Sequence, residues 1–174
     1  MRVYTKLKKL DLAHNKITMK IELQQTLLDK YPEFFSTDRK IYIGEKSMNE
    51  EVQELLNQKE IVLPIQFGIE TENGWFWLLD KLLNTIQHYC KDNNKPPINI
   101  TQIKEKMGGL CFNYIGGDEI IDGMVWLAES LSYYICEYCG TNKNVGITQS
   151  WYSTICKDCH TKIENRKNLF WKEN

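Results

Sequence analysis

The sequence lacks any apolar run that approaches the roughly 20 residues a bilayer-spanning helix needs. Its basic start, MRVYTKLKKL, is followed by neither an apolar core nor a small-residue cleavage site, so we expect no signal peptide. Hydrophobic and charged contents of 42% and 26% are ordinary for a soluble globular protein. We therefore expect a soluble, cytoplasmic protein.

A strong charge of either sign is also missing, because 22 basic residues nearly balance 23 acidic ones and leave a net charge of −1. Such a chain has no overall field that would draw in nucleic acid, so any anion binding must come from a local patch. The sequence also lacks repeats and low-complexity tracts. Its 174 residues predict about one domain, with a small metal-stapled lobe as an additional element.

What the sequence does contain is six cysteines, which in a reducing compartment are more often metal ligands or buried thiols than disulfides. A CxxC turn presents two thiolates from one tight loop, and two such turns complete a tetrahedral zinc shell. The segments CEYCG and CKDCH supply this pattern through Cys136, Cys139, Cys156 and Cys159. We expect the remaining two, Cys90 and Cys111, to be plain buried thiols.

The residues around these pairs predict the type of zinc lobe. The intervening segment NVGITQSWYSTI can form a short hairpin, and the residues after Cys156 have helical spacing through Ile163, Lys167 and Phe170. A knuckle, a hairpin and a helix carrying the second pair follow one another in treble-clef zinc fingers. We therefore expect a treble-clef-like lobe over residues 136–174.

Four thiolates saturate the metal and leave no position for an activated water, so the predicted zinc is structural rather than catalytic. His160 offers an alternative Cys₃His shell, which the four cysteines make unnecessary. Nuclease chemistry in treble-clef fingers needs a histidine base beside the finger, but none of His14, His88 and His160 lies in the predicted hairpin. This disfavours a nuclease.

Helical periodicity recurs in the chain before the cysteines. It predicts helices over 20–31, over 74–90 with Asn73 as its cap, and over 119–135 with Asp118 as its cap. The inward-facing residues of the last helix are predicted to be Ile121, Met124, Val125, Ala128 and Leu131. A capping box in SMNEEVQELLNQ predicts a further short helix with Val52, Leu55 and Leu56 inward.

Two segments have β character. EIVLPIQFGIE contains Pro64, which restricts it to an edge strand or an extended loop. INITQIKEKMGGLCFNYIGG predicts a hairpin with its turn at Gly108-Gly109, which pairs Met107 with Leu110. We therefore expect an α+β fold in which amphipathic helices pack on a small antiparallel sheet. Its parts are an N-terminal extension (1–20), a body (21–135) and the zinc lobe.

The predicted hairpin contains the first group of candidate ligand-binding residues. One of its faces presents Lys104 and Lys106 beside Cys111 and Asn113. Two adjacent cations flanked by polar groups can hold a phosphate or a carboxylate, although a solvated strand face is the more ordinary interpretation.

A second group precedes the helix at 74–90. Glu70 and Glu72 lie on the same side of an extended segment, and Trp77 lies off the main apolar face of the helix. Aromatic rings and carboxylates at a helix start can form a pocket for a base or ribose. Paired carboxylates can also act as acid and base, but no nucleophile with an assigned base accompanies them.

The order of several motifs resembles that of small uncharacterised proteins of tailed bacteriophages and prophages. The matching segments are IQFGIE, NGWFWLLDKL, IKEKMGGLCFNY, AESLSYYICEYCG and WYSTICKDCH. They correspond to the family's GIE strand, GWxxLID, KEKFGGLRFY, AExxS and CxxC finger, over most of residues 21–160. Cys111 and Asn113 stand where the family has arginine and tyrosine. The resemblance supplies no reaction, because no activity is established for the family at large.

These features lead to three functional hypotheses. The first, which the resemblance implies, is a counter-defence or host-takeover factor in the host cytoplasm that sequesters a nucleotide-derived immune signal or a host protein. The second is a nucleic-acid-binding regulator that acts through Lys162, Arg166 and Lys167 of the finger helix. The third is a hydrolase that uses Glu70 and Glu72. Small sequestering proteins often build their sites between subunits, so a homo-oligomer is compatible with the first hypothesis.

Overall fold

The computed structural model describes residues 19–35, 68–164 and 166–174, and it has the predicted α+β class. The first elements are α2 (Ile21–Lys30), the 3₁₀ helices η1 (Pro32–Phe35) and η2 (Asn73–Trp75), β1 (Ile69–Glu70), α4 (Phe76–Asp92), β2 (Asn99–Lys106) and β3 (Gly109–Ile115). They are followed by α5 (Glu119–Ser132), β4 (Val145–Thr148), β5 (Thr154–Cys156), α6 (Lys157–Lys162) and β6 (Trp171–Glu173). Among the described helices, none has both the length and the apolar character needed to cross a membrane. The predicted helix at 47–58, residues 60–67 and most of the predicted extension lie outside the described residues.

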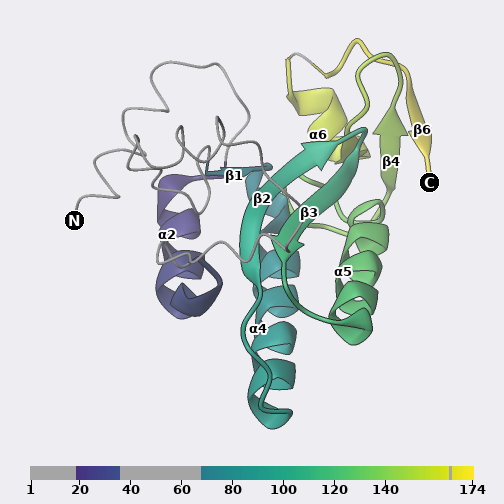
Figure 1. Cartoon of the computed structure of the whole chain (residues 1–174). Coiled ribbons are helices and arrows are strands. Elements are labelled where there is room, and N and C mark those ends of the chain that lie inside the picture. Colours follow the sequence, from purple (N-terminus) through teal and green to yellow (C-terminus); the bar gives the residue numbers. More distant parts are fainter. Residues whose placement is uncertain (1–18, 36–67, 165) are drawn as a thin grey trace, which may run out of the picture.

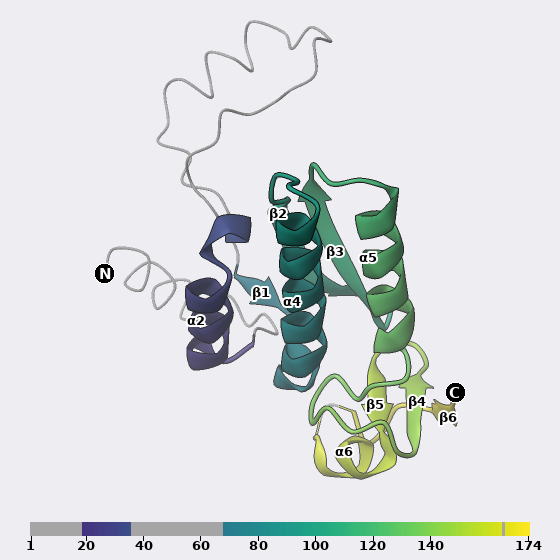
Figure 2. The same cartoon turned by 90° about the horizontal axis from the view of Figure 1, so that it is seen from below.

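The body is built on a three-stranded sheet in the order β1-β2-β3. β2 and β3 form the predicted antiparallel hairpin. β1, at the end of the segment predicted as an edge strand or loop, is an edge strand, but it pairs with β2 in parallel, so the sheet is mixed and not purely antiparallel as predicted. Figures 1 and 2 show α4 and α5 side by side against one face of this sheet. The main core fills the space between the helices and the sheet, with side chains such as Leu79, Leu83, Ile103, Phe112 and Val125.

The helix α4 confirms the predicted apolar face. Its buried residues are Leu78, Leu79, Leu82, Leu83, Ile86 and Cys90. The predicted cap is wrong, however, because Asn73 lies in the preceding 3₁₀ turn and makes no capping bond to α4. Its side-chain oxygen instead accepts a hydrogen bond from the backbone N–H of Lys20, at 2.8 Å. Asn73 therefore fixes the chain just before α2.

A buried amide joins α2 to the sheet. Gln24 is 4% exposed, and its side chain donates to the carbonyl of Met19 and accepts from the backbone N–H of Ile69, the latter at 2.9 Å. Because both ends of the amide are satisfied, its burial carries little desolvation penalty. Gln24 therefore holds the start of β1 against α2.

The hairpin turn differs from the prediction by one residue. Positive φ angles of 55° and 84° place the turn at Met107-Gly108, so Lys106 pairs with Gly109 instead of Met107 with Leu110. A Cβ on Gly109 would lie 2.4 Å from the hydroxyl of Tyr133, so this glycine is needed inside β3 for close packing. The register moves by two residues, and the predicted faces of the strands are therefore unchanged.

Helix α5 has the predicted cap and most of the predicted inward face. Ile121, Val125 and Ala128 are buried, but Leu131 is 43% exposed. Ser132 takes the inward position instead, where its hydroxyl accepts from the backbone N–H of Leu110 and donates to the carbonyl of Glu129. The inward position for which the apolar pattern predicts a leucine is thus taken by a serine, which bonds to a backbone N–H group of β3.

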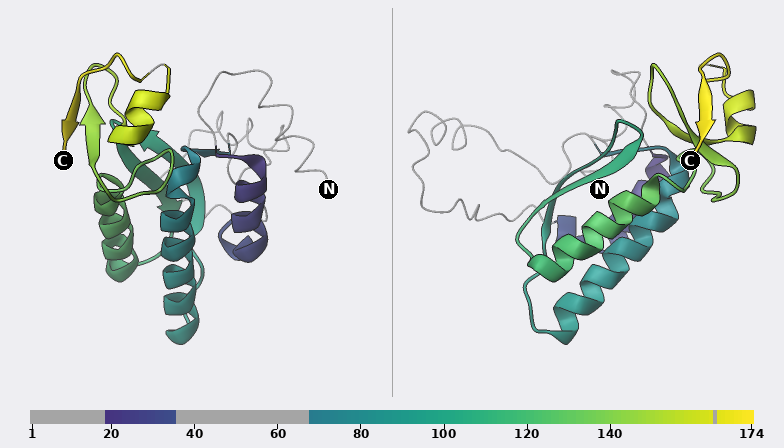
Figure 3. Two further views of the ribbon diagram at one scale, coloured as in Figure 1. Left: turned by 180° about the vertical axis from the view of Figure 1, so that it is seen from behind. Right: turned by 90° about the vertical axis from the view of Figure 1, so that its right-hand side faces the viewer.

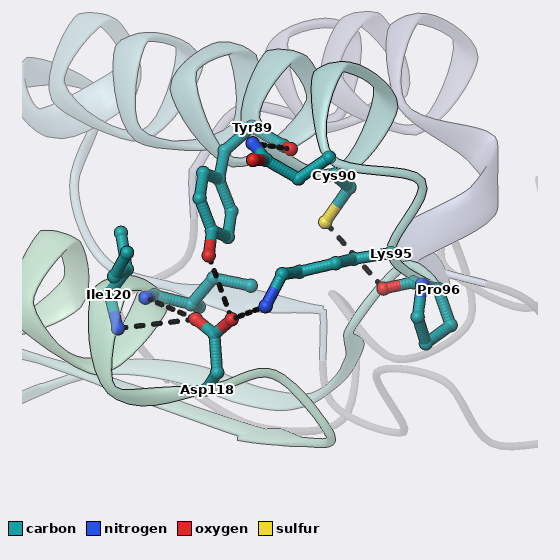
Figure 4. Close-up of polar contacts among 8 residues, drawn as sticks. Tyr89, Cys90, Lys95, Pro96, Asp118 and Ile120 are labelled. Carbon is teal, nitrogen blue, oxygen red and sulfur yellow. Dashed lines mark hydrogen bonds and ion pairs between the residues drawn. The ribbon is translucent and has the colours of Figure 1, made fainter.

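Asp118 is the centre of the polar cluster in Figure 4. Its Oδ1 accepts from the backbone N–H groups of Ile120 and Ile121 at 3.1 Å, and its Oδ2 accepts from Tyr89 and Lys95. The hydrogen bond from Lys95, followed by that from Tyr89, lowers the pKa of this carboxyl to about 2. The cluster joins the end of α4 to the start of α5.

We expect Asp118→Ala to lower the melting temperature by a few degrees, because it removes the cap and the partner of Lys95. A carboxyl with a lowered pKa stabilises the fold above pH 3.8, and this contribution is lost as the pH falls towards 2. The matched variant Asp118→Asn retains a capping side chain but cannot form the ion pair. Thermal melts from pH 2 to 7 should show a shallower acid limb in both variants, and an unchanged acid limb would contradict the assignment.

Candidate metal centre

The structure brings the four predicted cysteines together. The sulfur atoms of Cys136, Cys139, Cys156 and Cys159 lie within 4.8 Å of one another, and none of the four is in a disulfide. A tetrahedron with zinc–sulfur bonds of about 2.3 Å has sulfur–sulfur edges of about 3.8 Å. The distance of 3.7 Å between the sulfurs of Cys139 and Cys156 matches such an edge. The donor set therefore fits a tetrahedral divalent ion.

Backbone geometry prepares the first cysteine pair. The N–H of Gly140 donates to the carbonyl of Cys136 at 2.8 Å, and Gly140 adopts a φ of 77°, which glycine tolerates without strain. At the second pair, the backbone N–H of Cys159 donates to the sulfur of Cys156 at 3.4 Å. These contacts orient the sulfurs from two separate turns towards one point.

Without a bound cation, the environment of the cluster keeps two of its thiols, those of Cys136 and Cys159, protonated. Burial raises the pKa of the Cys136 thiol to about 12, and burial together with the neighbouring sulfurs raises the pKa of Cys159 well above its ordinary value. Four thiolates at this spacing would repel one another strongly. A bound divalent ion offsets that repulsion and deprotonates its ligands, so metal binding and ionisation occur together.

His160 lies outside the sulfur cluster. Its ring is buried, with Nε2 3.0 Å from the carbonyl oxygen of Leu169 and the ring centroid 6.3 Å from that of Trp171. Among residues 19–35, 68–164 and 166–174, the four cysteines are the only His, Cys, Asp or Glu residues grouped closely enough to share a metal ion. The structure therefore favours a Cys₄ shell over the Cys₃His alternative.

The chain around the cluster has the predicted hairpin, β4 with β5, followed by α6, whose first turn carries Cys159. The predicted continuation of this helix through Lys167 and Phe170 is wrong, because α6 ends at Lys162 and the chain returns as β6 beside β4. A Cβ on Gly146 would lie 2.2 Å from the carbonyl oxygen of Lys172 and 2.7 Å from the indole of Trp171, whose Nε1 donates to the carbonyl of Ile155 at 2.9 Å. This packing selects a strand over a helix.

The C-terminal lobe that carries the four cysteines, residues 136–164 and 166–174, is called the metal lobe below. It is docked on the body through the NGW segment (residues 73–75). The N–H of Gly74 donates to the carbonyl of Glu137 at 2.6 Å, and Nε1 of Trp75 donates to the carbonyl of Ile135 at 2.8 Å. A Cβ on Gly74 would lie 2.2 Å from the carbonyl oxygen of Cys136. Gly74 is therefore required for contact with the first cysteine turn.

A second contact uses the β2–β3 turn. The hydroxyl of Thr154 donates to the carbonyl of Gly108 at 2.5 Å, and a Cβ on Gly108 would lie 2.8 Å from Ile147. The NGW segment and the MGG turn of the β2–β3 hairpin thus contact the same lobe. Gly74 and Gly108 therefore serve the packing of this lobe on the body. Figure 3 shows from two sides that the lobe lies at one end of the body.

Glu137 is a buried carboxylate that the sequence did not indicate. It lies inside the CEYCG turn, is 1% exposed, and accepts from the backbone N–H of Glu72 at 3.0 Å. Burial raises the pKa of its carboxyl to about 8. From the sequence, a single acidic residue between two cysteines is expected to be an exposed loop residue. Glu137 is buried because the lobe docks on the body around Gly74.

Arg166 is a buried cation in the same lobe. Its Nε donates to the hydroxyl of Tyr138 at 3.0 Å, and its guanidinium carbon lies 5.6 Å from the ring centroid of Trp151. The sequence assigned Arg166 to an exposed helix face for nucleic acid. The structure instead gives it a packing role between aromatic side chains.

Three of the predicted ligand residues share one face of the sheet, opposite the helices. Glu70 is aligned with Lys104 in the parallel pair, and Gln102 is aligned with Asn113 in the hairpin. The amide of Gln102 donates to Glu70 at 3.0 Å and accepts from Asn113 at 3.4 Å. We refer to Glu70, Gln102, Lys104 and Asn113 as the polar sheet face.

The other predicted ligand residues lie elsewhere or at the edge of this face. Lys106 is exposed at the end of β2. Glu72 is at the junction with the metal lobe, where burial raises the pKa of its carboxyl. Trp77 is 62% exposed on α4, with the ammonium of Lys81 5.9 Å from its ring centroid. Glu70 thus lies on the polar sheet face, whereas Trp77 lies on the exposed side of α4.

Comparison with protein-family models, curated proteins and solved structures finds no match to this chain. The fold and the sulfur cluster together define the class: an α+β protein with a four-cysteine cluster, suited to a metal ion, in its C-terminal part.

Proposed function

We propose that this chain is a binding protein in which a zinc ion, held in a treble-clef-like lobe, serves as scaffold and the polar sheet face recognises an anionic, nucleotide-derived ligand. The observation that carries the proposal is the hydrogen-bonded series Asn113, Gln102 and Glu70, aligned beside Lys104. The four sulfurs would leave the metal no open position for substrate. Recognition is therefore assigned to the body.

The chemistry of the polar sheet face matches such a ligand. Lys104 and Lys106 supply positive charge for a phosphate, and the amides of Gln102 and Asn113 present both donors and acceptors. Glu70 is only 4% exposed and accepts from Gln102, so it orients that amide. A nucleotide offers these complementary groups in one molecule.

Calorimetric titration of the zinc-loaded chain with cyclic dinucleotides, cyclic oligoadenylates and ADP-ribose tests the proposal. We expect Lys104→Glu to weaken binding at least about tenfold, because it replaces a charge-assisted hydrogen bond by repulsion. Lys91→Glu, an equal change of charge on the exposed end of α4, should leave affinity unchanged. If none of these probes binds, or if the two variants lose affinity equally, the proposal is contradicted.

A substitution at Cys111 can raise the affinity for the ligand, because Cys111 is aligned with Lys104 across the hairpin. We expect Cys111→Arg to strengthen phosphate binding, because it adds a bidentate cation beside the existing one. The phage-protein resemblance has arginine at this position. A counter-defence or host-takeover role, which that resemblance suggests, extends the same proposal to a biological setting.

A nucleic-acid-binding role is the second candidate, and exposed aromatic side chains on the metal lobe favour it. Trp151 and Phe170 are 58% and 65% exposed, and the backbone of Gln149 is bonded to that of Phe170. Bases stack on such rings, with affinity that falls steeply as salt rises. Binding of single-stranded oligonucleotides that is insensitive to salt, or to Trp151→Ala, would exclude this role.

The hydrolase hypothesis has weaker support. Glu70 is bonded to the sheet through Gln102, whereas the backbone of Glu72 is bonded to the metal lobe through Glu137. Turnover of any bound nucleotide, assayed in Glu70→Gln and Glu72→Gln, is the direct test of catalytic roles for these carboxyls.

A further inference from the structure

Helix α5 carries apolar side chains on a second face in addition to the one that packs on the body. This face consists of Ile120, Leu127 and Leu131, with the half-buried Met124 at its inner border where it also packs against the main core, and it continues to Tyr134 just beyond the helix. We refer to these five residues as the outer seam. Ile120, Leu127 and Tyr134 are 54%, 55% and 61% exposed. A helix with apolar residues on both faces normally has a partner on each.

The spacing of the outer seam indicates what kind of partner fits. Its residues follow one another at intervals of four, three, four and three, which is the pattern of helices that pack side by side with interlocking side chains. The positions bordering the seam on its outer side are Gly123 and Ser130. A Cβ on Gly123 would meet no atom within 4 Å, so a second helix can approach closely there.

We propose that the outer seam is a homodimer interface in which α5 packs antiparallel against α5 of a second copy of this chain. The pairing is centred on Leu127, which meets Leu127 of the second copy. In this register Leu131 faces Gly123 of the second copy, and Met124 faces Ser130 of the second copy. Leu131 and Met124 are thus each placed opposite a small residue, while Leu127 meets Leu127 and Ile120 meets Tyr134 of the second copy as apolar pairs.

The charges of α5 select the antiparallel direction. Asp118, Glu119 and Asp122 cluster at its start, and no basic residue occurs along the helix or in its last turn. A parallel pair would bring the two acidic clusters together, and it would also align the helix dipoles. The antiparallel pair separates the acidic clusters by the length of the helix, about 20 Å.

The antiparallel pair also offers the acidic cluster a basic neighbour. The C-terminal Asn174 donates a hydrogen bond to the carbonyl of Tyr133, so β6 lies against the end of α5. Lys172 is exposed in β6. In the dimer, the start of α5 from one copy comes close to Lys172 of the other.

The exposed area is of the right order for this interface. The exposed parts of Ile120, Leu127, Leu131 and Tyr134 offer on the order of 400 Å² of mostly apolar surface. A stable dimer buries about 800 Å² per partner, and the remainder would come from the backbone and the polar rim. An area of this size suits a dimer with micromolar to nanomolar affinity.

Analytical ultracentrifugation of the zinc-loaded full chain tests the dimer, with the dissociation constant as the readout. We expect Leu127→Glu to weaken the dimer at least about 100-fold, because the two-fold axis brings the two new carboxylates together. Trp77→Glu places the same charge on an exposed aromatic position of α4 and should leave the dimer intact. Equal zinc content, and equal melting temperature at a concentration low enough for both variants to be monomeric, establish that each protomer is folded.

Cross-linking tests the direction of the helices. In a Cys111→Ser background, an equimolar mixture of Gly123→Cys and Leu131→Cys chains should form mixed disulfides under mild oxidation. Disulfides between identical variants instead would show a parallel pair and overturn the proposed register.

A chain that stays monomeric at 100 µM, on the order of a hundred times a micromolar dissociation constant, would overturn the proposal. Thiol labelling of Leu127→Cys then distinguishes two other ways in which the seam can be covered. Slow labelling means that another segment of the same chain covers it. Fast labelling means that it is open to a foreign protein. A dimer that persists in Leu127→Glu would likewise exclude the outer seam as the interface. All these readouts are independent of nucleotide binding, so they succeed or fail separately from the proposed function.

Discussion

Complete removal of the metal from the full chain is expected to unfold its C-terminal lobe. The lobe has a small core of Cys136, Val145, Ile155 and Cys156, so the sulfurs themselves form a large part of what is buried. Structural zinc contributes on the order of 10 kcal/mol in small fingers, far more than such a core supplies. Amide hydrogen exchange of residues 136–174, measured with and without a chelator, should show loss of protection throughout the lobe.

A matched pair of cysteine variants separates metal binding from general thiol effects. Cys156→Ser removes a buried ligand and should lower zinc content and melting temperature together. Cys111→Ser changes a cysteine outside the cluster and should alter neither. A lobe that keeps its protection after complete chelation would refute the structural role. A metal with three sulfur ligands and one bound water would refute the closed shell.

The second large effect is expected from Gly74→Ala. The added Cβ would lie 2.2 Å from the carbonyl oxygen of Cys136 and 2.5 Å from both the carbonyl oxygen of Glu137 and the nitrogen of Gly140. All three are backbone atoms of the first cysteine turn, which cannot rotate away as a side chain can. We expect a loss of about 3 kcal/mol, which corresponds to a fall in melting temperature on the order of 10 °C.

The control is a second glycine-to-alanine change in open space. Gly123 in α5 has no neighbour within 4 Å of an added Cβ, so Gly123→Ala should stabilise a protomer by up to about 1 kcal/mol. Melting at low protein concentration keeps any association from contributing. A Gly74→Ala variant as stable as the parent would show that the lobe does not dock as described.

Features governed by local chemistry could be predicted from the sequence. The two CxxC turns predict the sulfur cluster, because each turn fixes two ligands within a few residues. The periodicity of 76–90 predicts the buried face of α4, since one helical repeat sets which residues point inward. Asp118 caps α5 because its side chain reaches N–H groups two and three residues ahead.

Predictions failed where distant segments compete for the same residue. Asn73 has the local pattern of a cap but bonds to Lys20, 53 residues away. Gly109 is a typical turn residue, yet the ring of Tyr133 makes it a strand residue and moves the turn to Met107-Gly108. The apolar spacing that predicts Leu131 inward gives way to Ser132, which satisfies the backbone of β3.

By itself, the sequence determined the four clustered cysteines, the principal helices and the faces of the hairpin, because each depends on residues within about one turn or one strand of one another. Only the tertiary structure decided that the glycines of NGW and MGG receive the metal lobe and that Glu137 is enclosed. It also decided that α5 keeps an exposed second apolar face. These features depend on which surfaces remain after the elements pack, and no local pattern encodes that geometry.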